Sequence, residues 1–431
     1  MNSSINGAGS HMIRFLNQNK GFTLIEMVVA MGIFIVVIMI TANSFEIILR
    51  NTAKFMKSEE SNIEGVIALE ILRHDLEQAG YGLPYTFQAV APIYNEAGYA
   101  PANLLNDAPG GVPRAFASRN NLVAGDQGTT VASGGVFNFV AGADYLSIKG
   151  VSFGLNALSQ RWSYATYSSS TTGSKPPRIW KSDNLQNGDR VIVIRRRFSD
   201  STYANQLSYN TGTPAVYWAE FNASTGLPAG FSPLTPEENV YIYGVANVDL
   251  GMPFNRTDYF VGTPSDTTKI PSFCAAGSGI LYKATVYHTS SNPGGKLNYL
   301  PLLDCIADMQ VIYHWDLADS SGTIVTDQDS IGDGSVDTQS NADGSVVSGI
   351  ASVADVQAVL ANAAHIRTKL KKIEIHILAQ DGQRDQNYTS PSSFPMGGSL
   401  GRIYTLTAAM ANYHWKIYRI NVIPKNLAAN Q

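Results

Sequence analysis

The sequence lacks an excess of positive charge. Its 431 residues carry 30 Lys and Arg against 34 Asp and Glu, a formal net charge of −4, and charged residues make up only 15 % of the chain. Surfaces that bind nucleic acid are usually marked by clustered Lys and Arg. We therefore expect no nucleic acid among the partners. The length exceeds that of one average domain and suggests an anchor plus one large or two smaller globular parts.

Charge is almost absent from one stretch near the N-terminus. Between residues 22 and 49 only Glu26 and Glu46 are charged, and most other side chains are apolar. A membrane-spanning helix needs about 20 predominantly apolar residues, so this stretch is long enough. Arg14 and Lys20 precede it, and by the positive-inside rule they hold the N-terminus in the cytoplasm. The rest of the chain would then lie outside the cytoplasm.

A cleaved secretory signal is the alternative interpretation of this stretch. Such a signal has an apolar core of about 7–15 residues, followed by small residues at the cleavage site. Here the small residue Gly21 comes before the apolar run. A cut after Gly21 would remove only the leader and leave the span attached.

The segment Lys20-Gly21-Phe22-Thr23-Leu24-Ile25-Glu26 resembles the processing site of the type IV prepilin family. The resemblance implies that a prepilin peptidase cuts between Gly21 and Phe22 and methylates the new N-terminal Phe22. It also implies that Glu26 pairs with the N-terminal amine of a neighbouring subunit and sets the register of a fibre. A carboxylate in a membrane helix is costly and usually has a partner. The alternative is a Glu at the headgroup boundary with no role.

Residues 1–21 form the expected leader. Within it, Gly9-Ser10-His11-Met12 looks like a vector remnant, or Met12 is the true start. We therefore leave residues 1–11 out of the functional argument as a tag or a misassigned start.

The helix is expected to continue beyond the membrane. From Glu46 onward apolar residues recur at roughly helical spacing, and Gly80 and Pro84 are typical of a helix end. This pattern predicts one helix over residues 22–80, with its membrane-spanning half at residues 22–49.

Helical periodicity is scarce after Gly80, where β-branched and aromatic residues take over. Residues 81–138 resemble a long loop, rich in Gly, Pro, Ala and Asn. Strict alternation in residues 373–377 predicts one buried and one solvated face. The expected strands cover residues 144–149, 190–198, 240–250, 280–288, 306–315, 370–378 and 414–422.

These elements predict an α+β fold. A long N-terminal α-helix, membrane-spanning in its first half, would pack on a β-rich, mainly antiparallel globular head with long loops. The head divides into a first part, residues 81–250, and a second part, residues 251–431.

Two further segments resemble PilW-like minor pilins. The first is Ile71-Leu72-Arg73-His74-Asp75-Leu76-Glu77-Gln78-Ala79-Gly80-Tyr81, where an Asp-Leu pair precedes Ala-Gly-Tyr at a helix end, as also in J-type pseudopilins. The second is Leu303-Asp304-Cys305-Ile306-Ala307-Asp308-Met309. In the simpler interpretation, the apolar residues of the first segment contact a core and Gly80 caps the helix. Both interpretations can hold together.

Cysteine is scarce, with only Cys274 and Cys305 in the chain. Outside the cytoplasm an even pair most often forms a disulfide, so we expect a bond between these two. Two separate buried thiols are the alternative.

One acidic, glycine-punctuated run offers a candidate calcium loop, because Ca²⁺ prefers clustered oxygen ligands. Its carboxylates are Asp327, Asp329, Asp333 and Asp337. The EF-hand pattern fails at Ile331 and Thr338, and a solvated acidic loop is the simpler interpretation. No other cofactor is expected.

Catalytic motifs are weak. Gly397-Gly398-Ser399-Leu400-Gly401 matches the nucleophile elbow of serine hydrolases, but that motif needs a strand before it and a helix after it, and here it follows a Ser- and Pro-rich loop. The histidines are scattered singly, without the spacing of a zinc site. We expect no catalytic residue and no enzyme activity.

Taken together, the resemblance implies a minor pilin that primes type IV pilus assembly and sits at the pilus tip. Before assembly it would span the inner membrane once, with its head in the periplasm; afterwards it would lie at the pilus tip or cell surface. Its partners would be the prepilin peptidase, other minor pilins, the major pilin, the inner-membrane assembly platform and the membrane. The alternatives are a J-like type II secretion pseudopilin and a pilin-anchored tip adhesin or glycan-binding protein.

Overall fold

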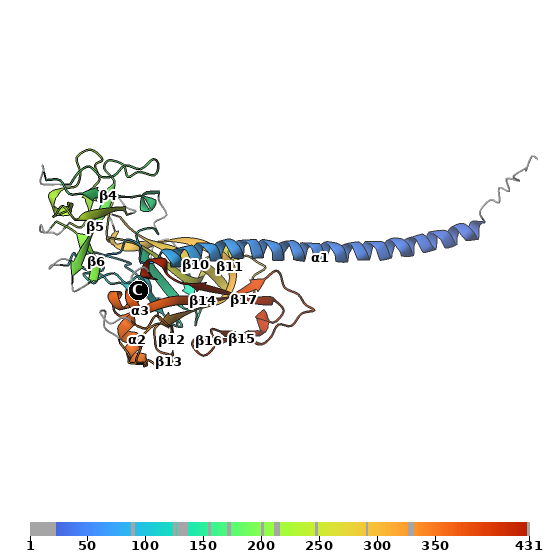
Figure 1. Cartoon of the computed structure of the whole chain (residues 1–431). Helices are drawn as coiled ribbons and strands as arrows, with labels where there is room; N and C mark the ends of the chain where they lie inside the picture. The colour runs from blue at the N-terminus through green and yellow to red at the C-terminus, as the bar shows by residue number, and fades with distance from the viewer. Residues whose placement is uncertain are drawn as a thin grey trace, which may run out of the picture. The chain divides into compact units, whose positions relative to one another are not determined.

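A computed structural model of the chain shows a long helix and a β-rich head (Figure 1). It describes residues 23–87, 91–123, 126, 137–153, 157–169, 174–199, 202–210, 216–245, 249–289, 292–325 and 332–428. The chain divides into two compact units, residues 1–56 and 57–431. The expected α+β class, with a long helix and a mainly antiparallel head, is confirmed.

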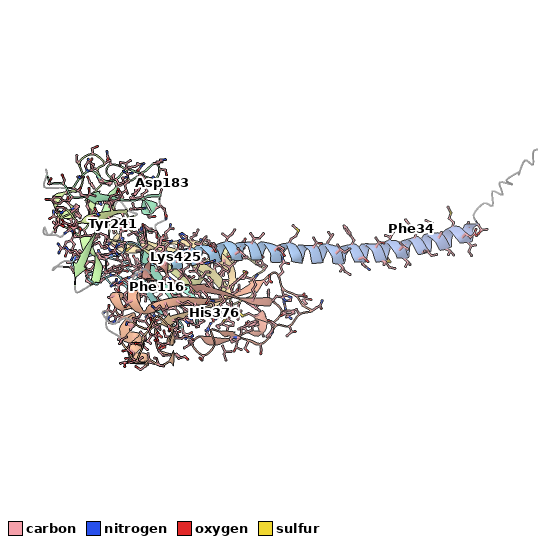
Figure 2. The ribbon with its side chains drawn as sticks, in the orientation of Figure 1. Phe34, Phe116, Asp183, Tyr241, His376 and Lys425 are labelled. Carbon is pink, nitrogen blue, oxygen red and sulfur yellow. A yellow bond between two sulfur atoms is a disulfide. The ribbon has the colours of Figure 1, made fainter. Side chains whose placement is uncertain are left out.

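Helix α1 (Leu24–Gln78) runs through both units. In the first unit, its segment Leu24–Leu49 is long and apolar enough to cross a membrane, and its side chains are exposed in the isolated chain. Figure 2 labels one of them, Phe34. Apolar side chains left exposed over 26 residues are what a helix in contact with lipid requires.

In the second unit, the C-terminal turns of α1 pack on the head. Ala68, Leu72, Leu76 and Ala79 are buried and recur every three or four residues, so they form one face of the helix. Gly65 lies so close to Tyr418 that a Cβ on the glycine would collide with the phenol. The helix ends at Gln78. Gly80, two residues later, has a φ of +80° that suits glycine, and its N–H donates to Lys149 O.

The main sheet has ten described strands, and all of its pairings are antiparallel. Its path runs β1-β3-β9-β10-β11-β12-β13, with β14 and β17 joined through β11 and with β2 beside β9. The strands are β1 (Phe116–Arg119), β2 (Phe137–Phe139), β3 (Tyr145–Gly150), β9 (Asn255–Pro264), β10 (Gly279–Thr289), β11 (Asn292–Trp315), β12 (Thr338–Asn341), β13 (Val347–Gly349), β14 (Leu370–Asp381) and β17 (His414–Val422).

A second sheet is inserted between two neighbouring strands of the first. Gly150 at the end of β3 pairs directly with Asn255 at the start of β9, so the chain leaves and re-enters the main sheet at one point. Residues 151–254 between them build the order β4-β8-β5-β6, with β7 beside β5. These strands are β4 (Trp162–Thr166), β5 (Arg190–Ser199), β6 (Thr202–Ser208), β7 (Ala219–Glu220) and β8 (Asn239–Gly244).

The inserted sheet has its own buried cluster on one face, built around Val191, Val193 and Ile242. On the other face, Ile192 and Ile194 join the main core. The predicted boundary at residues 250 and 251 therefore runs between two strands, β3 and β9, that pair in one continuous sheet.

Smaller elements complete the head. They are the hairpin β15 (Ser393–Met396) and β16 (Arg402–Thr405), the helices α2 (Val353–Leu360), α3 (Ala363–Lys369) and α4 (Lys425–Ala428), and the short 3₁₀ turns η1 (Ala102–Leu105), η3 (Ala157–Gln160), η4 (Ala229–Phe231), η5 (Thr267–Lys269) and η6 (Ala408–Met410). Ser352 and Asp355 form a capping box at the start of α2.

The structure corrects two expectations. Residues 81–138, expected as one long loop, are not loop throughout, because Phe116–Arg119 form strand β1 of the main sheet, and Tyr94 and Glu96 in this segment are buried. In β14 both faces are covered, because Glu374 and His376 are buried as well as Ile373 and Ile375. The turn at Gly397, between β15 and β16, lies against His376 and Ile312 and covers this second face.

Candidate functional site

The N-terminus of α1 carries a complete capping box. The carboxylate oxygen Oε2 of Glu26 accepts hydrogen bonds from Thr23 N (2.9 Å) and Thr23 Oγ1 (2.9 Å). The N–H of Glu26 donates in return to Thr23 Oγ1 at 3.4 Å. Thr23 precedes the first helical residue and Glu26 is the third, so the pair satisfies amide groups that a helix end leaves without partners.

The cap gives Glu26 a local partner in a segment that has very few other polar groups. Both hydrogen bonds from Thr23 end on the same carboxylate oxygen. The predicted processing residues Gly21 and Phe22 lie outside the described residues, and the pairing of Glu26 with another subunit stays a prediction.

The other end of α1 is attached to the head by a buried ion pair. Asp75 Oδ2 lies 2.6 Å from Lys283 Nζ on β10 and accepts a hydrogen bond of 2.6 Å from the hydroxyl of Tyr259 on β9. Lys283 and Tyr259 are direct cross-strand partners, so both reach the helix from the same face of the sheet. We call these three residues the helix latch.

Charge pairing keeps Asp75 ionised in the latch. Burial alone would raise the pKa of Asp75, but its contacts with His74 and Lys283 outweigh burial and lower that pKa. Burial raises the pKa of Tyr259 well above its usual value, so the phenol remains a donor. A second contact, between Lys425 and Glu77, joins α1 to α4 near the same helix end.

A larger buried charge network links strands β3 and β9 to the segment at residues 96–107, and sequence analysis did not find it. Lys149 Nζ lies 2.7 Å from Glu96 Oε2, and Arg256 Nη1 lies 2.9 Å from the same oxygen. Arg256 Nε also lies 2.8 Å from Asp258 Oδ1. Asp107 belongs to the network because its Oδ2 forms an ion pair with Lys149 Nζ. The only sequence signal was that charged residues interrupt the strands, which does not identify partners far along the chain.

The structure joins Cys274 and Cys305 in a disulfide, with their Cα atoms 5.0 Å apart. The bond links the loop before β10 to the middle of β11. It closes a loop over a sequence separation of 31, and Ala275, next to Cys274, belongs to the small buried cluster that contains Met396, Met410 and Trp415.

The candidate calcium loop is only partly described, because Asp327 and Asp329 lie outside the described residues. Asp337 Oδ2 accepts hydrogen bonds from the backbone N–H groups of Leu317 (2.8 Å) and Ala318 (2.7 Å). Asp333 Oδ1 accepts from Ser335 N at 2.8 Å. Among the described residues, no group of three or more His, Cys, Asp or Glu side chains could hold a metal ion. Calcium binding stays untested.

The elbow-like sequence at Ser399 lies in a hairpin turn. Ser399 is exposed between β15 and β16, whereas a nucleophile elbow joins a strand to a helix.

Two of the scattered histidines, on the neighbouring strands β11 and β14, do meet at Glu374. His376 Nε2 lies 2.6 Å from one carboxylate oxygen of Glu374, and His314 Nε2 lies 3.3 Å from the other (Figure 2 labels His376). Arg419 Nε also contacts Glu374, at 2.6 Å.

Comparisons with known proteins gave one match. The family model described as the prokaryotic N-terminal methylation motif matches residues 16–42, which include the capping box and most of the apolar span. Neither a curated protein nor a solved structure gave a significant match. The motif implies processing by a prepilin peptidase and association with a membrane, and it does not single out the PilW-like class. The chain therefore carries the N-terminal methylation motif at the start of a long apolar helix that leads into a β-rich head, which supports a type IV pilin-like family.

Proposed function

We propose that this protein is a minor pilin that primes type IV pilus assembly and stays at the pilus tip. The observation that carries the proposal is the matched N-terminal motif on an apolar helix whose only early charge is Glu26. After processing, the free amine of Phe22 would lie one helical turn from Glu26. Exchange of the local cap for the amine of a neighbouring subunit would then align helices within a fibre.

The size of the head supports a tip position. The inserted module at residues 151–254 adds a second sheet that a packed shaft subunit does not need. A subunit at the tip has nothing stacked above it, so a bulky head is tolerated there.

The proposed partners are the prepilin peptidase, other minor pilins, the major pilin and the inner-membrane assembly platform, with the head in the periplasm before assembly. The proposed role is structural, without catalysis and without a required cofactor.

A clean deletion scored in parallel for surface pili and secreted enzymes tests the proposal. Loss of pili with normal secretion supports priming. Loss of secretion with normal pili assigns the protein to the type II secretion pseudopilins, which use the same kind of helix. If pili and secretion both survive and only adherence falls, the protein is an adhesin that uses a pilin anchor.

A further inference from the structure

The inserted module presents a group of partly exposed aromatic side chains. Trp162 and Tyr164 lie on the edge strand β4, and Trp180 comes from the segment that follows it. The ring centroids of Trp162 and Trp180 are 4.9 Å apart, and those of Tyr164 and Trp180 are 6.1 Å apart. We call these three residues the aromatic shelf. Tyr241 on β8, labelled in Figure 2, pairs directly with Tyr164 and extends the same face.

The aromatic shelf is not part of a hydrophobic core. None of its three residues belongs to the buried clusters of the described head, whereas four residues of β5, which lies beyond β8 in the same sheet, do: Val191, Ile192, Val193 and Ile194. Trp162 remains 36 % exposed, and Tyr164 and Trp180 are half-buried. Large aromatic surfaces left partly in water and not used for packing are typical of binding surfaces.

Hydrogen bonds fix the position of the shelf. Trp180 Nε1 donates to Trp162 O at 2.8 Å. The side chain of Asn184 holds the backbone of Trp180 on both sides, since Oδ1 accepts from Trp180 N (2.6 Å) and Nδ2 donates to Trp180 O (2.9 Å). A ligand therefore meets aromatic rings that are already ordered, which lowers the entropy cost of binding.

Positive charge borders the shelf. Lys175, Arg178 and Lys181 are exposed on the segment that runs beside β4, where Lys175 N donates to Thr166 O and Arg178 N to Tyr164 O, both at 2.9 Å. Within the described part of the chain, none of these three cations forms an ion pair with a carboxylate. Three exposed cations beside ordered aromatic rings are complementary to a ligand that carries both carboxylates and flat apolar faces.

We propose that the aromatic shelf and its three cations bind an acidic polysaccharide. The C–H faces of pyranose rings would stack on Trp162 and Trp180, and the uronate carboxylates would pair with Lys175, Arg178 and Lys181. Single-stranded nucleic acid also combines stacking with negative charge, but its usual binding groove is a long cationic track. This site offers three cations on a chain of net charge −4 rather than such a track, which favours the polysaccharide.

The test is binding of full-length protein in detergent micelles to fluorescent alginate, with neutral dextran and oligo-dT as competing probes. We expect alginate binding that weakens as salt rises. Trp162→Ala should weaken it by about tenfold, the range that one lost aromatic contact produces. Lys175→Gln/Lys181→Gln should weaken it by a similar factor without disturbing the fold. Lys269→Gln/Arg384→Gln removes the same charge from exposed positions elsewhere and should leave binding unchanged.

The proposal would be overturned by no alginate binding, by equal binding of dextran, or by tighter binding of oligo-dT that is lost in the same variants. An equal effect of the control double variant would also overturn it, because the attraction would then come from net charge alone. The shelf variants should still restore pili to a deletion strain, so this inference and the proposed assembly role can fail independently.

Discussion

Individual buried charges hold the head of this protein together. Asp75, Glu96 and Glu374 are each almost completely buried, and each is matched by cations on a different part of the chain. A buried charge is tolerated only when its partners remain in place, and removal of one partner is strongly destabilising. The stability of the head therefore depends on a few specific pairs.

Lys283→Met tests the helix latch. The substitution leaves Asp75 buried with Tyr259 and without its cation, so the free energy of unfolding should fall by about 3–5 kcal/mol. Urea unfolding of the full chain in detergent, followed by tryptophan fluorescence, measures it. Lys269→Met at an exposed site should cost less than about 0.5 kcal/mol. Equal losses for the two variants would show that the latch adds nothing.

Glu374 makes the stability of the head depend on pH in the acidic range. Burial alone would raise its pKa, but hydrogen bonds from Arg419 and His376 lower it to about 2, against an ordinary value of 4.5. The unfolded chain then binds the proton more tightly, so this stability is fully present above pH 4.5 and is lost as the pH falls toward 2. Arg419→Gln should lower stability at neutral pH and flatten the loss between these values in urea titrations. A curve parallel to that of wild type would contradict the assignment, and Arg384→Gln is the control.

At the scale of elements, two features predict separate outcomes: the capped start of α1 and the disulfide between the β10 loop and β11. The first concerns assembly and the second concerns stability of the head. Each is open to a substitution that leaves the other intact.

Glu26→Gln separates the cap from the charge. The amide oxygen can still accept from Thr23, so the helix start is kept, while the negative charge for a neighbouring amine is lost. We expect normal membrane insertion but exclusion from sheared pili, measured by immunoblot of membrane and fibre fractions. Thr23→Val is the converse control, because it removes the hydroxyl of the cap and keeps the charge, and it should still enter fibres. Normal incorporation of Glu26→Gln would argue against charge pairing between subunits.

Cys274→Ala/Cys305→Ala tests the disulfide. Loss of a cross-link over a separation of 31 should lower the free energy of unfolding by about 2–4 kcal/mol, mainly by freeing the unfolded chain. The reduced wild type should unfold like the double variant, and reductant should not change the double variant further. Unchanged urea midpoints on both counts would show that the bond contributes no stability.

At the scale of the whole molecule, the sequence predicts secondary structure correctly where the local residue pattern decides it. Strands β10, β14 and β17 begin within a residue of their predicted positions, because β-branched and aromatic residues dominate there. Strand β9 was missed, since Arg256 and Asp258 interrupt its apolar pattern and are buried only through partners such as Glu96. The insertion of one sheet between β3 and β9 also left no local signal, because it depends on pairing between distant residues.

In the candidate site, too, the features set by local sequence were predictable and those set by tertiary contacts were not. The processing motif and Glu26 lie within one short contiguous segment, so sequence alone identifies the motif. The family model matches it. The helix latch joins three elements, and the aromatic shelf joins an edge strand to a following loop. Both depend on tertiary contacts, which periodicity and composition do not report.

Priming predicts how fibres respond to the amount of this protein. If it starts each fibre and stays at the tip, the number of fibres per cell should rise with its expression while their mean length stays constant. Electron microscopy of a deletion strain with titratable expression measures both quantities. Constant fibre number, or a length that changes with expression, would place the protein in the shaft or outside the pilus and would contradict the priming role.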